Sequence, residues 1–228
     1  MSPSIPFEVR SQHCWLSPER CLYWEEERCL VVSDLHFGKT GHFRKSGIAV
    51  PQQVYRDDLH RLMSLVTHFK PESILFTGDL FHSHENLEHD LFSRWRSSIQ
   101  ASRIILVRGN HDLLTAKAYA GMDIELHNRS LSWGPFLFVH DLKDAIDDTP
   151  AGRYVFSGHI HPGIRLSGTG KQSVRLPCFV FTENHALLPA FSHFTGLALI
   201  DPEKTDRVFA VIPAEKKKGN PATVIPIQ

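Results

Sequence analysis

Apolar and β-branched runs recur along the first half of the chain, and each ends in small or polar residues. Three such runs are CLVVSD at 29–34, SILFTGD at 73–79 and RIILVRGNHD at 103–112. Each is typical of a buried strand followed directly by a loop. Between them, apolar residues recur with helical spacing over 51–69 and 87–99. This β-α-β-α-β order predicts parallel strands, with functional groups at their carboxyl ends.

From about residue 124 the pattern changes to short strands without long helices. An antiparallel second half is the simplest account of these strands. Together the two halves predict an α/β (mixed α+β) fold class, a four-layer αββα sandwich in which two facing mixed β-sheets are flanked by helices. We expect a single domain over 1–212. The segment 213–228 is polar, contains proline and has no periodicity, so we expect it to form a flexible C-terminal tail.

Composition narrows the class of protein. Lys and Arg number 25 against 25 Asp and Glu, so no bulk field would hold the chain on nucleic acid or an anionic membrane. Neither a transmembrane run nor a secretory signal pattern is present, so we expect a soluble cytoplasmic protein without a membrane partner. The 4 cysteines have no disulfide or zinc-knuckle spacing. The chain has 15 histidines but only 4 tyrosines and 4 tryptophans, and the positions of the histidines decide whether they bind metal.

Five short segments, each after an apolar strand, carry the candidate chemistry. They are Asp34-Leu35-His36, Gly78-Asp79, Gly109-Asn110-His111-Asp112, His140 and Gly158-His159-Ile160-His161. Carboxylate, carboxamide and imidazole donors together suit two borderline to hard divalent cations. We expect the glycines where the chain turns sharply or where a phosphate approaches the backbone. Helix caps or partnered histidines would explain any single position, but all five segments in order favour a metal site.

These segments resemble the signature of the calcineurin-like metallophosphoesterases, whose blocks read Asp-x-His, Gly-Asp, Gly-Asn-His-Asp/Glu, His and Gly-His-x-His. Two further stretches, FRKSGIAVP at 43–51 and LPAFSHFTG at 188–196, look like those of the bacterial ligase-associated DNA damage response phosphoesterases, which are described as endonucleases. The similarity runs from about residue 20 to residue 200.

The resemblance implies a ligand set for each of two ions. The first ion would be held by Asp34, His36, Asp79 and His161, and the second by Asp79, Asn110, His140 and His159. We expect Mn(II), with Fe, Zn, Co or Mg as alternatives, because a mixed oxygen and imidazole site accepts several metals. Catalysis would involve His111, facing the phosphate, with Asp112 orienting it. A hydroxide bound between the ions would attack phosphorus in line.

Substrate binding is predicted from basic residues near the metal blocks, namely Arg44, Lys45 and His84. Arginine can pair with phosphate oxygens through two hydrogen bonds, although a solvated loop explains these residues equally well. Two aromatic residues of the same region, Phe37 and Phe43, could stack on a base, but buried packing is the favoured role.

We therefore predict a metal-dependent phosphodiesterase that acts on nucleic acid in DNA repair, with a DNA ligase and a helicase as partners implied by resemblance alone. One alternative is an enzyme on small phosphoesters or nucleotide diphosphates, such as a UDP-diacylglucosamine pyrophosphatase-like enzyme, since one metal site serves many substrates. Another is a non-catalytic repair scaffold, which the seven intact ligand positions disfavour. The oligomeric state and the choice between DNA and RNA stay open.

Overall fold

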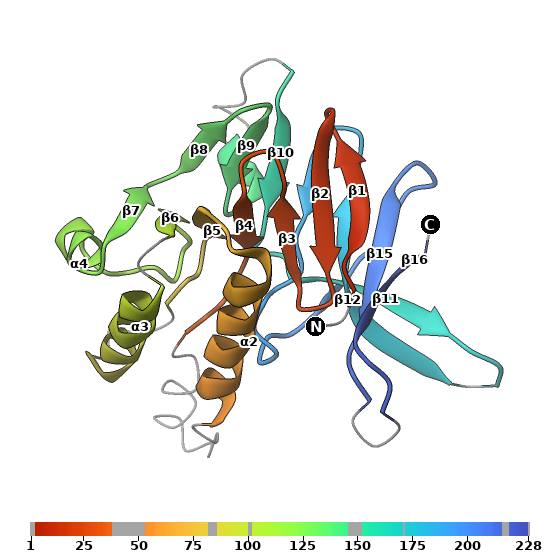
Figure 1. Cartoon of the computed structure of the whole chain (residues 1–228). Coiled ribbons are helices and arrows are strands. Elements are labelled where there is room, and N and C mark those ends of the chain that lie inside the picture. The colour runs from red at the N-terminus through yellow and green to blue at the C-terminus, as the bar shows by residue number, and fades with distance from the viewer. Residues whose placement is uncertain are drawn as a thin grey trace.

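The structure is a computed structural model of the chain and describes residues 3–37, 53–81, 86–99, 102–145, 152–170, 172–215 and 219–227. Two β-sheets face one another, and α-helices lie beside the first sheet (Figure 1). No helix within these ranges is long and apolar enough to cross a membrane.

The first sheet has seven strands in chain order. They are β1 (Ile5–Val9), β2 (Gln12–Ser17), β3 (Cys21–Trp24), β4 (Cys29–Val32), β5 (Ser73–Thr77), β6 (Arg103–Val107) and β7 (Ile124–His127). Strands β4 to β7 are parallel, which confirms the predicted β-α-β-α-β half. Strands β1 to β4 form an antiparallel meander, and its first three strands lie outside the prediction.

Three α-helices accompany the parallel strands: α2 (Gln53–Phe69), α3 (Asn86–Ser98) and α4 (Ala116–Gly121). The first two confirm the helical spacing seen in the sequence. Leu62 of α2 and Phe92 of α3 are fully buried in a cluster with Leu30 and Ile74 of the first sheet. The short helix α4 is not apparent from periodicity, but Thr115 caps it by accepting a hydrogen bond from the Ala118 amide at 3.2 Å.

The second sheet is built from the second half of the chain. Its strands are β8 (Ser130–Trp133), β9 (Phe136–Val139), β10 (Tyr154–Ser157), β11 (Pro162–Ser167), β12 (Ser173–Phe181), β13 (His185–Leu187), β14 (Ala198–Leu199), β15 (Arg207–Ile212) and β16 (Thr223–Pro226). The expected antiparallel arrangement is wrong for three pairs, because β9–β10, β10–β13 and β11–β14 are parallel. Between β9 and β10 the chain is long enough for a crossover and includes the 3-10 helix η1 (Leu142–Ala145), whereas a hairpin would force antiparallel pairing.

Strand β16 corrects the prediction of a flexible tail over 213–228. It pairs antiparallel with β15, with Val224 opposite Val211. Both valines are buried in the core between the sheets, which explains why this short segment joins the second sheet. The tail prediction is therefore wrong for residues 223–226, while residues 216–218 lie outside the described chain.

An aromatic core fills the space between the two sheets. Phe136, Phe138 and Phe156 of the second sheet pack in one cluster with Trp24 and Leu75 of the first. On the outer face of the second sheet, Leu142 of η1 packs against the buried strands within the described chain. Two facing mixed sheets with flanking helices confirm the predicted fold class.

Candidate metal centre

The predicted ligand side chains meet where strands of both sheets end. Loops after β4, β5 and β6 of the first sheet, and after β9 and β10 of the second, supply these side chains. Backbone hydrogen bonds tie the loops together, since the His36 amide donates to the Asp79 carbonyl at 2.8 Å and the Gly158 amide donates to the His140 carbonyl at 3.1 Å. The facing sheets thereby bring ligands to one place from positions more than a hundred residues apart.

The first predicted group converges around the imidazole of His36. Its Nε2 atom lies 3.3 Å from His161 Nε2 and 3.8 Å from Asp79 Oδ2. His161 Nε2 in turn lies 3.2 Å from Asp34 Oδ1. Two donors that each sit about 2.1 Å from one ion are separated by about 3 to 4 Å, so these spacings fit a shared ion.

The second predicted group converges on Nε2 of His140. That atom lies 3.0 Å from Asn110 Oδ1, 3.1 Å from His159 Nδ1 and 3.5 Å from Asp79 Oδ2. The same Asp79 oxygen is therefore near the histidine of each group. This placement allows Asp79 to contact two ions at once, as the resemblance implies.

Buried carboxylates make this site suited to cations. Asp34 and Asp79 are almost fully buried, and candidate donor sets within 4.8 Å are Asp34 with His36 and His161, and Asp34 with Asp79 and His140. Burial raises the pKa of Asp79, opposed by the charge of His140. Burial also acts to raise the pKa of Asp34, but the hydrogen bond and charge of His161 outweigh it and leave that pKa below its ordinary value. Adjacent buried carboxylates are costly without a cation, so the donor set fits divalent metal.

Five of the seven proposed ligand residues share an unusual backbone conformation. Left-handed φ values occur at Asp34 (51°), His36 (47°), Asp79 (50°), His159 (66°) and His161 (54°). Such values cost a non-glycine residue on the order of 1 kcal/mol or more, and they persist when surrounding contacts enforce them. The His159 amide, for example, donates to Asp34 Oδ2 at 3.0 Å. Such strain at five proposed ligands is consistent with a binding site whose geometry is enforced by its surroundings.

Three glycines make room for the ligands. A Cβ atom at Gly78 would overlap the His140 ring, one at Gly109 the Asp79 carboxylate, and one at Gly158 the Asp34 side chain. Of the two roles considered for these glycines, Gly78 with φ of 82° fits a sharp turn. Side chains of the proposed ligands His140, Asp79 and Asp34 occupy the space beside the three glycines, together with Ser33 at Gly158.

Outer contacts orient two of the histidines. His140 Nδ1 lies 3.2 Å from the Thr77 carbonyl oxygen, which leaves Nε2 to face the ligand group. His159 Nε2 lies 3.6 Å from Asp141 Oδ2, and its Nδ1 faces His140. Sequence reasoning missed Asp141, although its place directly after the proposed ligand His140 was the available signal.

The two residues predicted to be catalytic lie beside the ligands. The His111 amide donates to Asp79 Oδ1 at 2.9 Å, and the His111 ring lies 5.5 Å from the His36 ring. Asp112 accepts hydrogen bonds from the Phe81 amide at 3.0 Å and the Gly109 amide at 2.9 Å, and burial raises its pKa to about 6. These contacts join the loops after β5 and β6, so they support a structural role for Asp112. Its predicted effect on His111 stays a prediction.

The predicted substrate residues Arg44, Lys45 and His84 lie outside the described chain, as does Phe43. Phe37 is buried, with its ring packed near those of Phe81 and Phe92. Buried packing, the favoured role for Phe37, is therefore confirmed.

Two facing mixed sheets, with two overlapping groups of oxygen and imidazole donors at their edge, are consistent with a dinuclear metal site of the kind that metal-dependent hydrolases use. The chain belongs to the calcineurin-like phosphoesterases, whose family model matches residues 27–162. It is a metal-dependent phosphoesterase, and the predicted family is confirmed.

Solved structures are similar to this chain as well. The Pseudomonas putida nuclease MPE is 30% identical, with 91% of this chain and 96% of that chain covered and a TM-score of 0.77. The E. coli phosphoesterase Yfce is 12% identical, with 81% and 88% covered and a TM-score of 0.42. No curated protein matches the sequence significantly.

Proposed function

We propose that this protein is a phosphodiesterase that cleaves nucleic acid with two divalent metal ions. The observation that carries the proposal is the position of Asp79 Oδ2, 3.8 Å from Nε2 of His36 and 3.5 Å from Nε2 of His140. A carboxylate placed between two imidazole groups can bridge a pair of ions, and such pairs clamp the oxygens of an in-line phosphoryl displacement. Similarity to a nuclease over 91% of this chain supports nucleic acid as the substrate.

The side chains have distinct parts in this mechanism. Ions held by the seven ligands would supply Lewis acidity and lower the pKa of water toward neutrality. His140 is held with Nε2 toward the ligand group by its contact with the Thr77 carbonyl. His111 is fixed beside the proposed ligands by the hydrogen bond that its backbone amide donates to Asp79 Oδ1, so that its ring can stabilise charge on the departing oxygen or donate a proton to it.

Finer features of the proposal rest on the donor chemistry and on the sequence. We propose Mn(II) as the metal, which is one of several divalent ions that a mixed set of oxygen and imidazole donors accepts. With a net charge of zero, attraction to a polyanion must come from a local patch, and we propose Arg44, Lys45 and His84 for it. A cytoplasmic role in DNA repair beside a ligase or a helicase is proposed from the sequence resemblance alone.

The test compares hydrolysis of bis-p-nitrophenyl phosphate with that of p-nitrophenyl phosphate, in Mn(II) and in EDTA, followed by single-stranded and duplex DNA and RNA. We expect Mn(II)-dependent diester cleavage that falls at least about a hundredfold in Asn110→Ala, because a ligand of the second group is lost. Asn184→Ala is the matched control, since Asn184 is exposed in the turn before β13. It should retain wild-type activity.

Full diester activity in Asn110→Ala would refute the assigned site. Turnover confined to nucleotide diphosphates or phosphomonoesters would replace the nuclease with a small-molecule phosphoesterase. A lack of turnover with every divalent metal tried would favour the alternative that the protein is a non-catalytic repair scaffold.

A further inference from the structure

The stretch 188–196 contains no proposed metal ligand, yet it contacts the backbone of Ser33 and Asp34. The Phe191 amide donates to the Ser33 carbonyl at 2.8 Å, and the Ser192 amide donates to the Asp34 carbonyl at 3.3 Å. Asp34 has a left-handed φ of 51°, so its backbone needs outside contacts to stay in place. Residues 191 and 192 supply two such contacts from a distant part of the chain.

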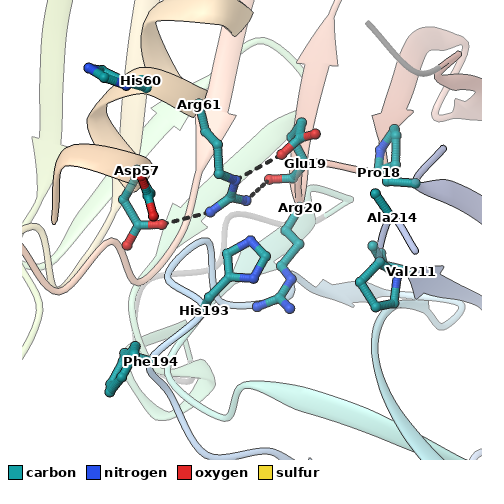
Figure 2. A pocket seen from close by; sticks show the side chains of 13 residues that line it. Pro18, Glu19, Arg20, Asp57, His60, Arg61, His193, Phe194, Val211 and Ala214 are labelled. Atoms are coloured by element: carbon teal, nitrogen blue, oxygen red, sulfur yellow. Dashed lines mark hydrogen bonds and ion pairs between the residues drawn. The ribbon is translucent and has the colours of Figure 1, made fainter. Parts of the chain in front are cut away.

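Arg61 of α2 holds this stretch. Its Nη1 atom donates to the Phe191 carbonyl at 3.0 Å, and its guanidinium lies 4.2 Å from the centre of the Phe191 ring. The same guanidinium donates to Glu19 Oε2 at 2.8 Å and to the Glu19 carbonyl at 2.8 Å (Figure 2). It also donates to Asp58 Oδ1 at 2.7 Å. Its side chain is 16% exposed, so these charge-assisted bonds are only partly screened by water.

A second arginine acts on the next residue of the stretch. Arg20 Nη1 donates to the Ser192 carbonyl at 3.1 Å, while the Ser192 amide contacts Asp34. Because the two guanidiniums lie close together, the charge of Arg61 contributes, after burial, to lowering the pKa of Arg20 to about 10. Asp58 and Glu19 offset this repulsion and fix Arg61 between them.

We infer that Arg61 is a positioning residue for the proposed metal ligand Asp34, acting through Phe191 and Ser192. This inference rests on the proposed metal-dependent function and adds to it a residue that touches no proposed ligand. A lysine cannot replace Arg61, because one ammonium group cannot span two carboxylates and two carbonyls in this planar arrangement.

A cavity beside Arg61 allows a chemical test of this role. The cavity has a volume of about 620 Å³, and its lining includes Arg61, Arg20, Pro18, His193 and Phe194. His193 and Phe194 are exposed, so the cavity reaches the surface. Truncation of Arg61 to alanine would enlarge this space, and a guanidinium ion from solution could then enter and restore the lost hydrogen bonds.

The experiment measures Mn(II) binding by isothermal titration calorimetry and by the electron paramagnetic resonance of the bound ion. In Arg61→Ala we expect affinity at one of the two sites to fall about 10- to 100-fold, the usual effect of losing a contact that orients a ligand. Guanidinium chloride, far below unfolding concentrations, should restore most of this affinity, whereas equal NaCl should not. Arg61→Lys should stay impaired.

Arg96→Ala is the matched control. Like Arg61, Arg96 is an arginine on a helix whose side chain is mostly shielded from water. It donates to the Ile99 carbonyl at 3.0 Å and to Asp123 Oδ2 at 2.5 Å. Asp123 precedes β7, so this pair lies at the opposite end of the parallel strands from the ligands. Arg96→Ala should lose stability and keep its Mn(II) affinity.

Wild-type affinity in folded Arg61→Ala would overturn the inference, as would a loss that guanidinium does not restore. If circular dichroism shows that Arg61→Ala does not fold, Glu19→Gln is the milder variant, because it weakens only the hydrogen bond between Arg61 Nε and the Glu19 side chain. We expect about a threefold loss of Mn(II) affinity there, since one charge-assisted bond is weakened, and an unchanged affinity would count against the role. Failure of the wild type to bind Mn(II) or any other divalent metal would instead refute the proposed function itself.

Discussion

His140 Nδ1 lies 3.2 Å from the carbonyl oxygen of Thr77, across the two facing sheets. Thr77 ends β5 of the first sheet, while His140 follows β9 of the second. With the Nδ1 proton donated to that carbonyl, the Nε2 lone pair is directed toward Asn110, His159 and Asp79. The approach of the two sheets thus determines which histidine nitrogen is available to a metal.

Gly78 allows this approach, and its replacement by alanine should disturb the site. Its φ is 82°, and a Cβ there would overlap the His140 ring. We expect Gly78→Ala to lower the free energy of unfolding by about 2 to 4 kcal/mol, from strain and overpacking together. Metal-dependent hydrolysis should be lost. Urea denaturation followed by circular dichroism measures the first effect.

The control for Gly78→Ala is Gly152→Ala. Gly152 has a φ of 88°, and an added Cβ there would meet no atom of the described residues within 4 Å, so this variant carries the strain without the overlap. We expect it to cost about 1 kcal/mol and to keep full activity. Equal losses in the two variants would show that the contact between Gly78 and His140 is unimportant.

The sequence predicted those parts of the site that depend on local order. Asp34, Asp79 and Asn110 each follow a strand of a parallel unit, and the carboxyl ends of such strands meet at one edge. Strand direction in the second half was not predictable in the same way, because alternation of side chains is identical in parallel and antiparallel strands. The parallel pair β9–β10, which brings His140 and His159 side by side, was therefore assigned wrongly.

Contacts between distant residues also escaped sequence reasoning. Arg61 and Phe191 are 130 positions apart, and no local pattern indicates that they meet. The short strand β16 is another case, since Val224 becomes buried only through pairing with β15. Asp141 differs, because it lies next to His140 in the sequence but its contact with His159 depends on the fold.

Asp141 should tune metal affinity through His159. Its Oδ2 atom lies 3.6 Å from His159 Nε2, on the side of the ring away from His140. A carboxylate there orients the ring and makes it a stronger donor, so Asp141→Asn should weaken Mn(II) binding about tenfold. Calorimetric titration measures this. Lys143→Ala removes an ammonium group that lies 3.5 Å from Asp141 Oδ2, and it should leave the affinity unchanged because Lys143 is highly exposed.

His193 should stay uncharged in mildly acidic solution. Although His193 is exposed at the cavity, the groups around its ring still remove part of its hydration. This desolvation, followed by the charges of Arg61 and Arg20, lowers the pKa of His193 to about 3. Because the ring is partly exposed, we expect a midpoint below about pH 5 in an NMR titration of its ring protons, against about 6.5 for a free histidine. The resonance is assigned by its absence in His193→Gln.

This depressed pKa also predicts a direction for stability. The unfolded chain takes up a proton on His193 below about pH 6.5 whereas the folded chain does not, so the contribution of His193 is present above that pH and lost as pH falls. His193→Gln should therefore show a weaker decline in unfolding free energy between about pH 7 and pH 5. Identical declines in both proteins, or an NMR midpoint near 6.5, would contradict the expected environment of the ring.

Metal removal should reverse the stability order of the wild type and Asp79→Asn. Asp79 is 2% exposed, and burial raises its pKa, so its charge is costly when no cation is bound. Asparagine keeps the shape and can still accept the His111 amide hydrogen bond. In EDTA we therefore expect Asp79→Asn to unfold at the same temperature as the wild type or at a higher one.

With Mn(II) at a hundred times its Kd, each site should stabilise the wild type by about 2.7 kcal/mol, whereas the variant should gain little. Thermal unfolding followed by circular dichroism in both buffers provides the comparison, and an equal gain from Mn(II) in the two proteins would show that Asp79 holds no ion.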